Sequence, residues 1–379
     1  GEQGRVGSRV LPKVLAGKPA QVLGDIDMKQ FTAAAALGIS IVLGLASNAQ
    51  AQALTPIKIS YQPSLYWALP FHIATEKGWW KDVGLAPEFS TFPAGVPQIA
   101  ASAAGSWDVG GTGSVPAVLG HVRFGIKTIG ITNDESAANG LVGSSKAAAD
   151  FAKDPVGALR GKTITLTQNS TADFAVQACL KKYGLKKSDV VMKNMGQAEI
   201  ISALSSNNSD LAGMWAPNTY TVEEKAGAKM LCNGKDSGAI VPGALIARGD
   251  YAKQNPQNVA KFLAVYLRAW SWMSVNRPEA IRMMKDFYAK GGVSISDAAM
   301  NKEFETRPTF TLAQQLKSME RTGGNANSTM DGWFTELSGF MRETGAVQQV
   351  PAVADFVTDE YMKLVQADAK LREMANSTR

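Results

Sequence analysis

The sequence predicts an α/β protein made of two lobes, each containing a largely parallel sheet between helices. Strand and helix patterns alternate along residues 57–131, the same alternation returns along residues 159–226, and a glycine-bounded apolar segment follows each unit. Alternating strands and helices build a parallel sheet with helices on its faces. The 379 residues are 45% hydrophobic and 19% charged, a globular composition with enough apolar side chains for both cores.

The first unit contains four expected strands and three expected helices. Short alternating or apolar runs predict the strands, and Pro63 and Gly78 end the first strand and the first helix. The expected strands span residues 57–61, 85–89, 107–110 and 127–131, and the expected helices span residues 69–77, 96–104 and 115–122.

The second unit repeats this order, and Ser170 or Thr171 caps its first helix. Its expected strands span residues 163–166, 190–193 and 210–214, and its expected helices span residues 171–183, 197–204 and 220–226. Gly140–Gly143 and Ala244–Ala247 are predicted to be two strands that cross between the lobes. Helical patterns follow at residues 258–274, 278–289, 312–319, 330–344 and 352–369, and we expect them to pack on lobe 1.

An export signal precedes the lobes. Met28 and Lys29 are followed by the uncharged apolar run Ala33–Ala46, which is too short to span a bilayer, and then by small residues in A-x-A spacing. We therefore assign residues 28–53 to a cleaved signal peptide, with a short buried helix as the alternative. Residues 1–27 are assigned to an upstream extension or an added leader, residues 54–140 with 245–379 to lobe 1, and residues 141–244 to lobe 2.

Export also bears on the two cysteines, Cys179 and Cys232. An oxidising compartment permits a disulfide between them. The alternative is a pair of buried free thiols, which is how unpaired cysteines usually pack. The sequence leaves both possibilities open.

The sequence lacks the residues that several functional classes require. The net charge of +6 is spread without basic runs, so we expect no nucleic-acid partner. His72 and Glu76 lie four residues apart on one expected helix, but no third metal ligand has suitable spacing, so we interpret them as a surface pair and expect no metal. Nucleophile-elbow, phosphate-loop and zinc-protease motifs are absent from the sequence, and we expect neither an enzyme nor a cofactor.

Two donor-rich segments lie where a strand leads into a helix. Gly110–Ser114 is expected to form a glycine turn into a helix, and Gln168–Asp173 repeats the arrangement in the other half. The backbone N–H groups and the positive dipole end of such a helix start attract an anion. The alternative is that each segment only caps its helix. If both segments face the interlobe cleft, they predict an anionic ligand held between the lobes.

Five segments carry a family resemblance: Ile59–Gln62, Ala74–Trp80, Gly105–Gly110, Leu159–Ile164 and Trp215–Pro217. In this order and spacing the sequence resembles the periplasmic solute-binding proteins of nitrate, sulfonate (taurine) and bicarbonate ABC importers. The resemblance implies the type II periplasmic-binding-protein fold, with two lobes joined by two crossover strands and a helical C-terminal region on lobe 1.

The resemblance also implies residues that line the interlobe cleft. The expected set is Gln62, Tyr66, Trp67, Gly113 and Ser114 from lobe 1, Asn169, Ser170, Thr171, Trp215 and Asn218 from lobe 2, and Glu135 and Asn139 from the first crossover. Glu135 and Asn139, together with Asp134, approach the first crossover and could contact a ligand amine, but the favoured alternative is a solvated loop. Ala216 stands where alkanesulfonate relatives often carry an acidic residue, which leaves the ligand open. Arg248, just beyond the second crossover, is expected to be exposed to solvent, and the alternative is that it turns inward and neutralises an anion.

The expected function is that of a monomeric periplasmic receptor. It would capture a small anion or zwitterion and deliver it to an ABC permease and its ATPase in the inner membrane. Two alternatives remain on the same fold. A pyrimidine-precursor synthase would need a cysteine-rich iron motif, which two separated cysteines do not supply, and a sensory binding protein would have no role in import.

Overall fold

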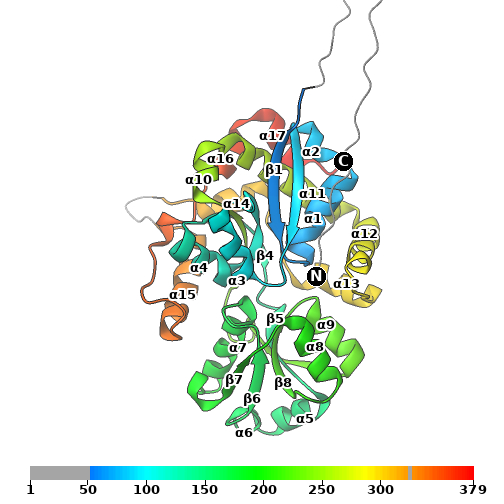
Figure 1. The fold of residues 1–379 in the computed structure, drawn as a ribbon, viewed down its shortest axis with the longest axis vertical. Helices are drawn as coiled ribbons and strands as arrows, with labels where there is room; N and C mark the ends of the chain where they lie inside the picture. The colour runs from blue at the N-terminus through cyan, green and yellow to red at the C-terminus, as the bar shows by residue number, and fades with distance from the viewer. Residues whose placement is uncertain (1–51, 323–326) are drawn as a thin grey trace, which may run out of the picture. The chain divides into compact units, whose positions relative to one another are not determined.

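The computed structural model describes residues 52–322 and 327–379. These residues form two lobes, each built around one five-stranded sheet (Figure 1). The upstream residues 1–27 and all but the last two residues of the expected signal peptide lie outside the described residues. Within those ranges, no helix combines the length and the hydropathy that a membrane span requires.

The sheet of lobe 1 has the strand order β2-β1-β3-β10-β4. Strand β1 pairs in parallel with β2 and β3, whereas β10 runs antiparallel between β3 and β4. The second crossover segment therefore completes this sheet, which is mixed. The strands are β1 (Thr55–Tyr61), β2 (Leu85–Thr91), β3 (Val109–Gly113), β4 (Lys127–Asp134) and β10 (Pro242–Ala247).

The sheet of lobe 2 has the matching order β7-β6-β8-β5-β9. Strand β6 pairs in parallel with β7 and β8, and the first crossover strand, β5, runs antiparallel between β8 and β9. Each lobe thus receives one crossover strand as an antiparallel member of its sheet. The strands are β5 (Asn139–Gly143), β6 (Thr163–Leu166), β7 (Val191–Asn194), β8 (Leu211–Trp215) and β9 (Lys229–Asn233).

The glycine-rich segment is a strand, so the expectation of a glycine turn was wrong. The expected strand at 107–110 is β3, and helix α4 begins directly after it at Ser114. A Cβ atom on Gly110 would lie 2.1 Å from the carbonyl oxygen of Ser60, and one on Gly111 would lie 2.9 Å from Cβ of Trp67. The glycines therefore allow close packing of β3 against β1 and α1.

Helices cover the sheets of both lobes (Figure 1). The C-terminal helices pack on lobe 1 as expected, with α11 against α1, α16 and α17. The predicted helix at 352–369 was wrong in its first half, where Val353–Asp355 form a 3₁₀ turn and the α-helix begins only at Glu360. Asp368 accepts the Leu371 N–H and caps a separate last helix. Lobe 1 carries α1 (Leu65–Glu76), α2 (Trp79–Asp82), α3 (Gly95–Ala101), α4 (Ser114–Phe124), α10 (Gly249–Gln254), α11 (Pro256–Val275), α12 (Arg277–Lys290), α13 (Asp297–Thr306), α14 (Leu312–Met319), α15 (Thr329–Glu343), α16 (Glu360–Ala367) and α17 (Ala369–Asn376). Lobe 2 carries α5 (Ser145–Lys153), α6 (Pro155–Leu159), α7 (Thr171–Lys182), α8 (Gln197–Ser205) and α9 (Asn218–Ala226), and 3₁₀ turns form at Ser102–Ala104, Lys187–Asp189 and Val353–Asp355.

The apolar cores follow the lobes. One large cluster fills lobe 1, and it also includes Phe174, Ala216 and Tyr220 from lobe 2. Two smaller clusters fill lobe 2, one around Phe151 and Leu180 and the other around Ile200 and Met214. Burial of apolar side chains is the main favourable term in folding, so each lobe has its own source of stability.

A disulfide joins Cys179 of α7 to Cys232 of β9 within lobe 2, so the alternative of two free thiols was wrong. The covalent link closes a segment with a sequence separation of 53 residues. Because it restricts the unfolded chain, such a link stabilises the folded lobe.

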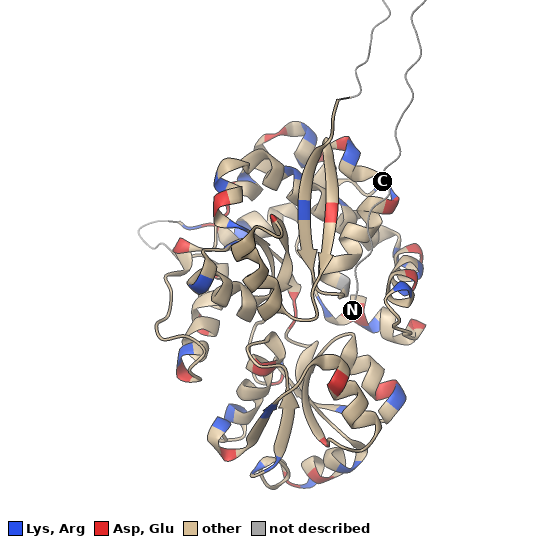
Figure 2. Ribbon diagram, in the orientation of Figure 1, with Lys and Arg blue, Asp and Glu red and all other residues tan. Residues whose placement is uncertain are grey.

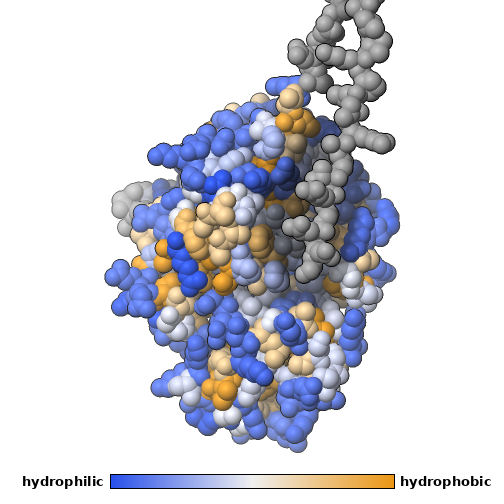
Figure 3. All heavy atoms as spheres, viewed as in Figure 1, coloured by the Kyte–Doolittle hydropathy of each residue, from blue (hydrophilic) through white to orange (hydrophobic). Residues whose placement is uncertain are grey.

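On the face shown in the figures, the distribution of charge agrees with the absence of basic runs in the sequence. On the face shown in Figure 2, basic and acidic residues are interspersed over the outer helices, and no basic stripe forms there. Figure 3 shows the same face as mostly hydrophilic, with apolar residues gathered over the region of α3 and α4.

Candidate ligand-binding site

The two lobes touch where the carboxyl ends of their strands face each other. A Cβ atom added to Gly113, at the end of β3, would lie 2.0 Å from Oγ1 of Thr171, the first residue of α7. The lobes therefore meet at this point closely enough that only a glycine fits. Nearby, the rings of Phe174 and Phe340 meet edge to face with centroids 4.8 Å apart, so α15 of lobe 1 also contacts α7.

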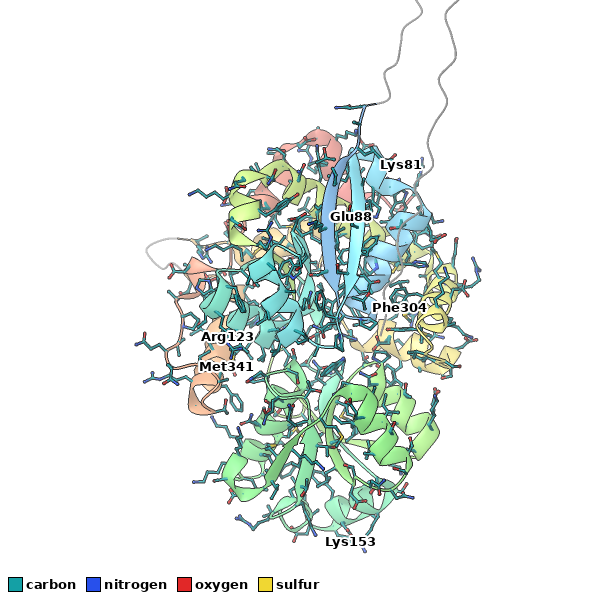
Figure 4. The ribbon with its side chains drawn as sticks, viewed as in Figure 1. Lys81, Glu88, Arg123, Lys153, Phe304 and Met341 are labelled. Atoms are coloured by element: carbon teal, nitrogen blue, oxygen red, sulfur yellow. A yellow bond between two sulfur atoms is a disulfide. The ribbon has the colours of Figure 1, made fainter. Side chains whose placement is uncertain are left out.

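A second contact between the lobes lies on the α13 side. The hydroxyl of Tyr220, on α9, donates a hydrogen bond to Oε1 of Glu303, on α13, over 2.9 Å. Figure 4 shows these two sides, with Phe304 of α13 and Met341 of α15 both close to the junction of the lobes. The candidate site lies at the strand ends where these contacts bring the lobes together.

In lobe 1, Gln62 follows β1 and is held by its own lobe. Its Nε2 donates to Oγ1 of Thr112 over 2.9 Å and to Oε1 of Gln98 over 3.1 Å. Gln98 in turn donates to Oγ of Ser60 and to the carbonyl oxygen of Gly111. All of these side chains are buried, so the network fixes the strand ends and uses the donors of the Gln62 amide.

Three other polar groups of lobe 1 have no partner among the described residues. They are Oγ of Ser64, which precedes α1, Nε1 of Trp67 in its first turn, and Oγ of Ser114 at the start of α4. The three residues are at most 4% exposed. Buried polar groups are almost always hydrogen-bonded, and an indole N–H can only donate. These groups therefore have a hydrogen-bonding capacity that the described protein groups do not use.

Lobe 2 contributes the start of α7, but its side chains are largely engaged. Oγ of Ser170 accepts the Asp173 N–H over 3.1 Å and donates to the Thr167 carbonyl oxygen over 2.6 Å. Asn169 has a φ of 57°, and its N–H donates to Oδ2 of Asp173. Burial raises the pKa of Asp173, although hydrogen bonds from Gln177 and from the Asn169 N–H oppose this. The hydroxyl of Ser170 thus caps the helix.

The turn after β8 is organised by Gln197, which the sequence did not single out. Oε1 of Gln197 accepts the Trp215 N–H over 3.4 Å and the Asn218 amide over 3.3 Å. Trp215 is 8% exposed and belongs to none of the three apolar clusters formed by the described residues. Its ring is therefore available to line a cleft, whereas Asn218 is held within lobe 2.

An open pocket of about 150 Å³ lies beside the start of α7. Its lining includes Asn169, Ser170 and Phe174 from lobe 2 and Val115 and Phe340 from lobe 1. The structure thus brings two of the expected site residues to a pocket between the lobes. The other ten expected residues do not line it: Gln62, Tyr66, Trp67, Gly113, Ser114, Glu135, Asn139, Thr171, Trp215 and Asn218.

Tyr66 lies within the packing of lobe 1. Its hydroxyl donates to the carbonyl oxygens of Glu303 and Arg307, and its ring stacks on Trp270 with centroids 4.9 Å apart. The guanidinium carbon of Arg307 lies over the Tyr66 ring, 4.1 Å from its centroid. Burial raises the pKa of Tyr66, so the hydroxyl stays protonated.

Glu135 and Asn139 are buried, so the alternative of a solvated loop was wrong for both. Oε1 of Glu135 accepts a hydrogen bond from Nη2 of Arg307 over 2.8 Å. Burial raises the pKa of Glu135 to about 7, against the opposing effects of Arg307 and of the Asn139 amide. Arg307 and Glu303 were not predicted as site residues, because the helix that carries Glu303, α13, was not predicted.

The remaining expectations concern ions. Arg248 pairs with Asp108 over 3.1 Å and with Asp250 over 2.8 Å. His72 packs beside Phe287, and burial lowers its pKa. Within the described ranges, no group of three His, Cys, Asp or Glu side chains is placed to hold a metal ion. The pocket beside α7 is lined by one carboxylate and one ammonium group, those of Asp173 and Lys187, together with polar and aromatic side chains.

Two donor-lined lobes that meet at the carboxyl ends of their strands define the architecture of a two-lobed binding protein. The profile of the NMT1/THI5-like family matches residues 68–281, more than half of the chain. The chain belongs to the NMT1/THI5-like family.

Individual relatives agree with this assignment. The chain is 29% identical to a putative aliphatic sulfonates-binding protein of Bacillus subtilis, over 62% of this chain and 70% of the relative. It is 26% identical to the taurine-binding periplasmic protein of Escherichia coli, over 83% and 94% of the two chains. The crystal structure of the periplasmic aliphatic sulphonate binding protein SsuA from Escherichia coli matches with a TM-score of 0.64 at 16% identity, over 82% of this chain and 99% of that one. This last likeness confirms the periplasmic-binding-protein fold.

Proposed function

We propose that this chain is the solute-binding component of an ABC importer, located in the periplasm. It captures a small organic anion or zwitterion of the sulfonate type between its lobes and presents it to a membrane permease with its ATPase. Binding closes the two lobes around the ligand, which replaces the water around the anion with fixed protein donors.

The unpartnered donors of lobe 1 carry this proposal. Ser64, Trp67 and Ser114 are buried without a partner among the described residues, and two of them begin or precede a helix whose dipole favours an anion. A buried donor without an acceptor costs about 1–3 kcal/mol, and a sulfonate or carboxylate oxygen would relieve that cost. The names of the relatives point to the same class of ligand.

The main alternative is an enzyme of the same family. A cysteine-rich iron motif would need several thiolates, but the chain has two cysteines and both form the disulfide. The residues of this chain thus favour binding without chemical conversion.

Thermal unfolding of the purified protein tests the proposal. The panel comprises taurine, ethanesulfonate, MOPS, nitrate and bicarbonate, with choline as a cationic control. At a hundredfold excess over Kd, a ligand adds about 2.7 kcal/mol of stability, which raises the Tm of a protein of this size by roughly 4 °C. We expect at least one sulfonate to do so and choline to have no effect. A panel in which no anion raises the Tm would contradict the proposal.

A further inference from the structure

A chain of hydrogen bonds links lobe 2 to both crossover segments. Tyr220 of lobe 2 donates to Oε1 of Glu303, and both carboxylate oxygens of Glu303 accept from Nη1 of Arg307 over 3.2 and 3.1 Å. Nη2 of Arg307 donates to Glu135, which follows β4, over 2.8 Å. The N–H of Glu135 then donates to the carbonyl oxygen of Val241, which precedes β10, over 2.6 Å. The contact between the lobes is thereby connected to the two segments that join them.

The side chains that form this series of hydrogen bonds are all buried. The side chains of Arg307, Glu303 and Glu135 are at most 1% exposed, and Tyr220 is 5% exposed. Hydrogen bonds to charged groups are worth more than neutral ones, and a buried charge that loses a partner is costly. While the lobes are in contact, the hydrogen bond from the Tyr220 hydroxyl therefore stabilises the buried carboxylate of Glu303.

In this series of hydrogen bonds, one guanidinium group lies between two carboxylates. Arg307 binds both Glu135 and Glu303, so Tyr220 adds a neutral donor to a site that is short of positive charge. Another cation, Lys302, has its Nζ 5.3 Å from the ring centroid of Tyr220 and pairs with Glu223 over 3.7 Å. Lys302 is about half exposed, so water screens its contribution. The buried hydroxyl of Tyr220 is thus the link from lobe 2 to the carboxylate of Glu303.

We propose that Tyr220, Glu303, Arg307 and Glu135 form a closure latch that holds lobe 2 against lobe 1 and thereby strengthens ligand binding. The four residues act on the ligand through the position of the lobes, so they are positioning residues. The effect on ligand binding rests on the proposed function, whereas the effect on the position of the lobes does not. Separation of the lobes removes the Tyr220 donor from Glu303, and a smaller closed population weakens apparent affinity in proportion.

The variant Tyr220→Phe tests the latch, because it removes the hydroxyl and keeps the ring. Tyr251→Phe is the matched control, since this buried tyrosine of α10 lies in lobe 1 and its hydroxyl interacts with Asn258 of the same lobe. Spin labels at Lys81→Cys and Lys153→Cys report the distance between the lobes, because these exposed positions lie at the far ends of lobe 1 and lobe 2 (Figure 4). Both native cysteines are in the disulfide, so the labels react only at the introduced thiols.

Without ligand, we expect Tyr220→Phe to shift the interlobe distances to longer values and Tyr251→Phe to leave them unchanged. For binding of the probe taurine, we expect Tyr220→Phe to raise Kd about tenfold through faster dissociation, as the loss of one hydrogen bond to a charged group predicts. Unchanged interlobe distances in Tyr220→Phe would overturn the latch. A shift in distance in a protein that binds none of the anion panel would support the latch and overturn the proposed function.

Discussion

The two lobes use their polar side chains differently at the strand ends. In lobe 1, Ser64, Trp67 and Ser114 are buried without a partner among the described residues. In lobe 2, Ser170 caps α7 and Asn218 is bound by Gln197. Lobe 1 therefore has donors to offer a ligand, whereas lobe 2 uses its donors to hold its own loops. We infer that lobe 1 makes most of the polar contacts and that lobe 2 closes over the ligand.

The largest expected effect is on the unfolding free energy and concerns Glu135, which lies between the two lobes. Its pKa is raised from 4.5 to about 7 in the folded protein. The folded state therefore binds a proton that the unfolded state has lost at the same pH, and stability decreases as pH rises from about 4.5 to 7. The loss is about 3 kcal/mol.

Urea unfolding of the wild type and of Glu135→Gln across this pH range measures the effect. We expect the difference in unfolding free energy between the two proteins to change with pH in that window. Parallel curves would show that Glu135 has an ordinary carboxyl pKa in the folded protein.

The next effect tests whether the lobes must meet at Gly113. Its φ of −72° suits any residue, so Gly113→Ala is not strained in lobe 1 itself, but the new Cβ would collide with Oγ1 of Thr171. If the closed state falls to about 1% of molecules, the apparent Kd for the ligand rises about 100-fold. Calorimetric titration measures this change.

Two variants control for the collision. Gly332→Ala changes a glycine whose Cβ position is open, and we expect unchanged affinity. Adding Thr171→Ala to Gly113→Ala removes the colliding oxygen and should restore part of the affinity. Full affinity in Gly113→Ala alone would mean that binding does not need this approach of the lobes.

Trp215 tests whether lobe 2 supplies an apolar wall. We expect Trp215→Ala to weaken ligand binding about 10- to 100-fold, because a large aromatic contact is lost. Trp333→Ala is the control, since this tryptophan packs on Phe310 of lobe 1. Unchanged calorimetric affinity in Trp215→Ala would remove Trp215 from the site.

A matched pair of serines gives the smallest and sharpest test of the comparison. Ser114→Ala should weaken binding of an anion about tenfold and leave the unfolding free energy of the free protein nearly unchanged, because its hydroxyl has no partner to lose. Ser170→Ala should cost about 1 kcal/mol of stability through the lost cap, with little change in affinity. The reverse pattern, measured by calorimetry and urea unfolding, would place the ligand on lobe 2.

The alternation of strands and helices was enough to predict the two sheets. Strand β6 was predicted to the residue, and α7 almost so, because β-branched residues end at a turn and Ser170 provides a cap. The crossover strands were also visible as glycine-bounded apolar segments. Their antiparallel pairing was not visible, because register depends on neighbours far away in the sequence.

The candidate site was predictable only in part. Motif positions indicated Trp67, Ser114 and Trp215, since these residues follow strand ends. Glu303 and Arg307 were missed because α13 has a weak helical pattern and their role depends on contact with Tyr220 and Glu135, which lie far away in the sequence. For the same reason, the fate of each hydroxyl could not be predicted, because it depends on which backbone groups lie within reach.

Calorimetric titration of the wild type with the anion panel tests the central claim most directly. A lobe that presents neutral N–H and O–H donors should bind one sulfonate or related anion per protein and should ignore choline. Tight binding of choline, or heat that reports no binding of any anion, would contradict the account.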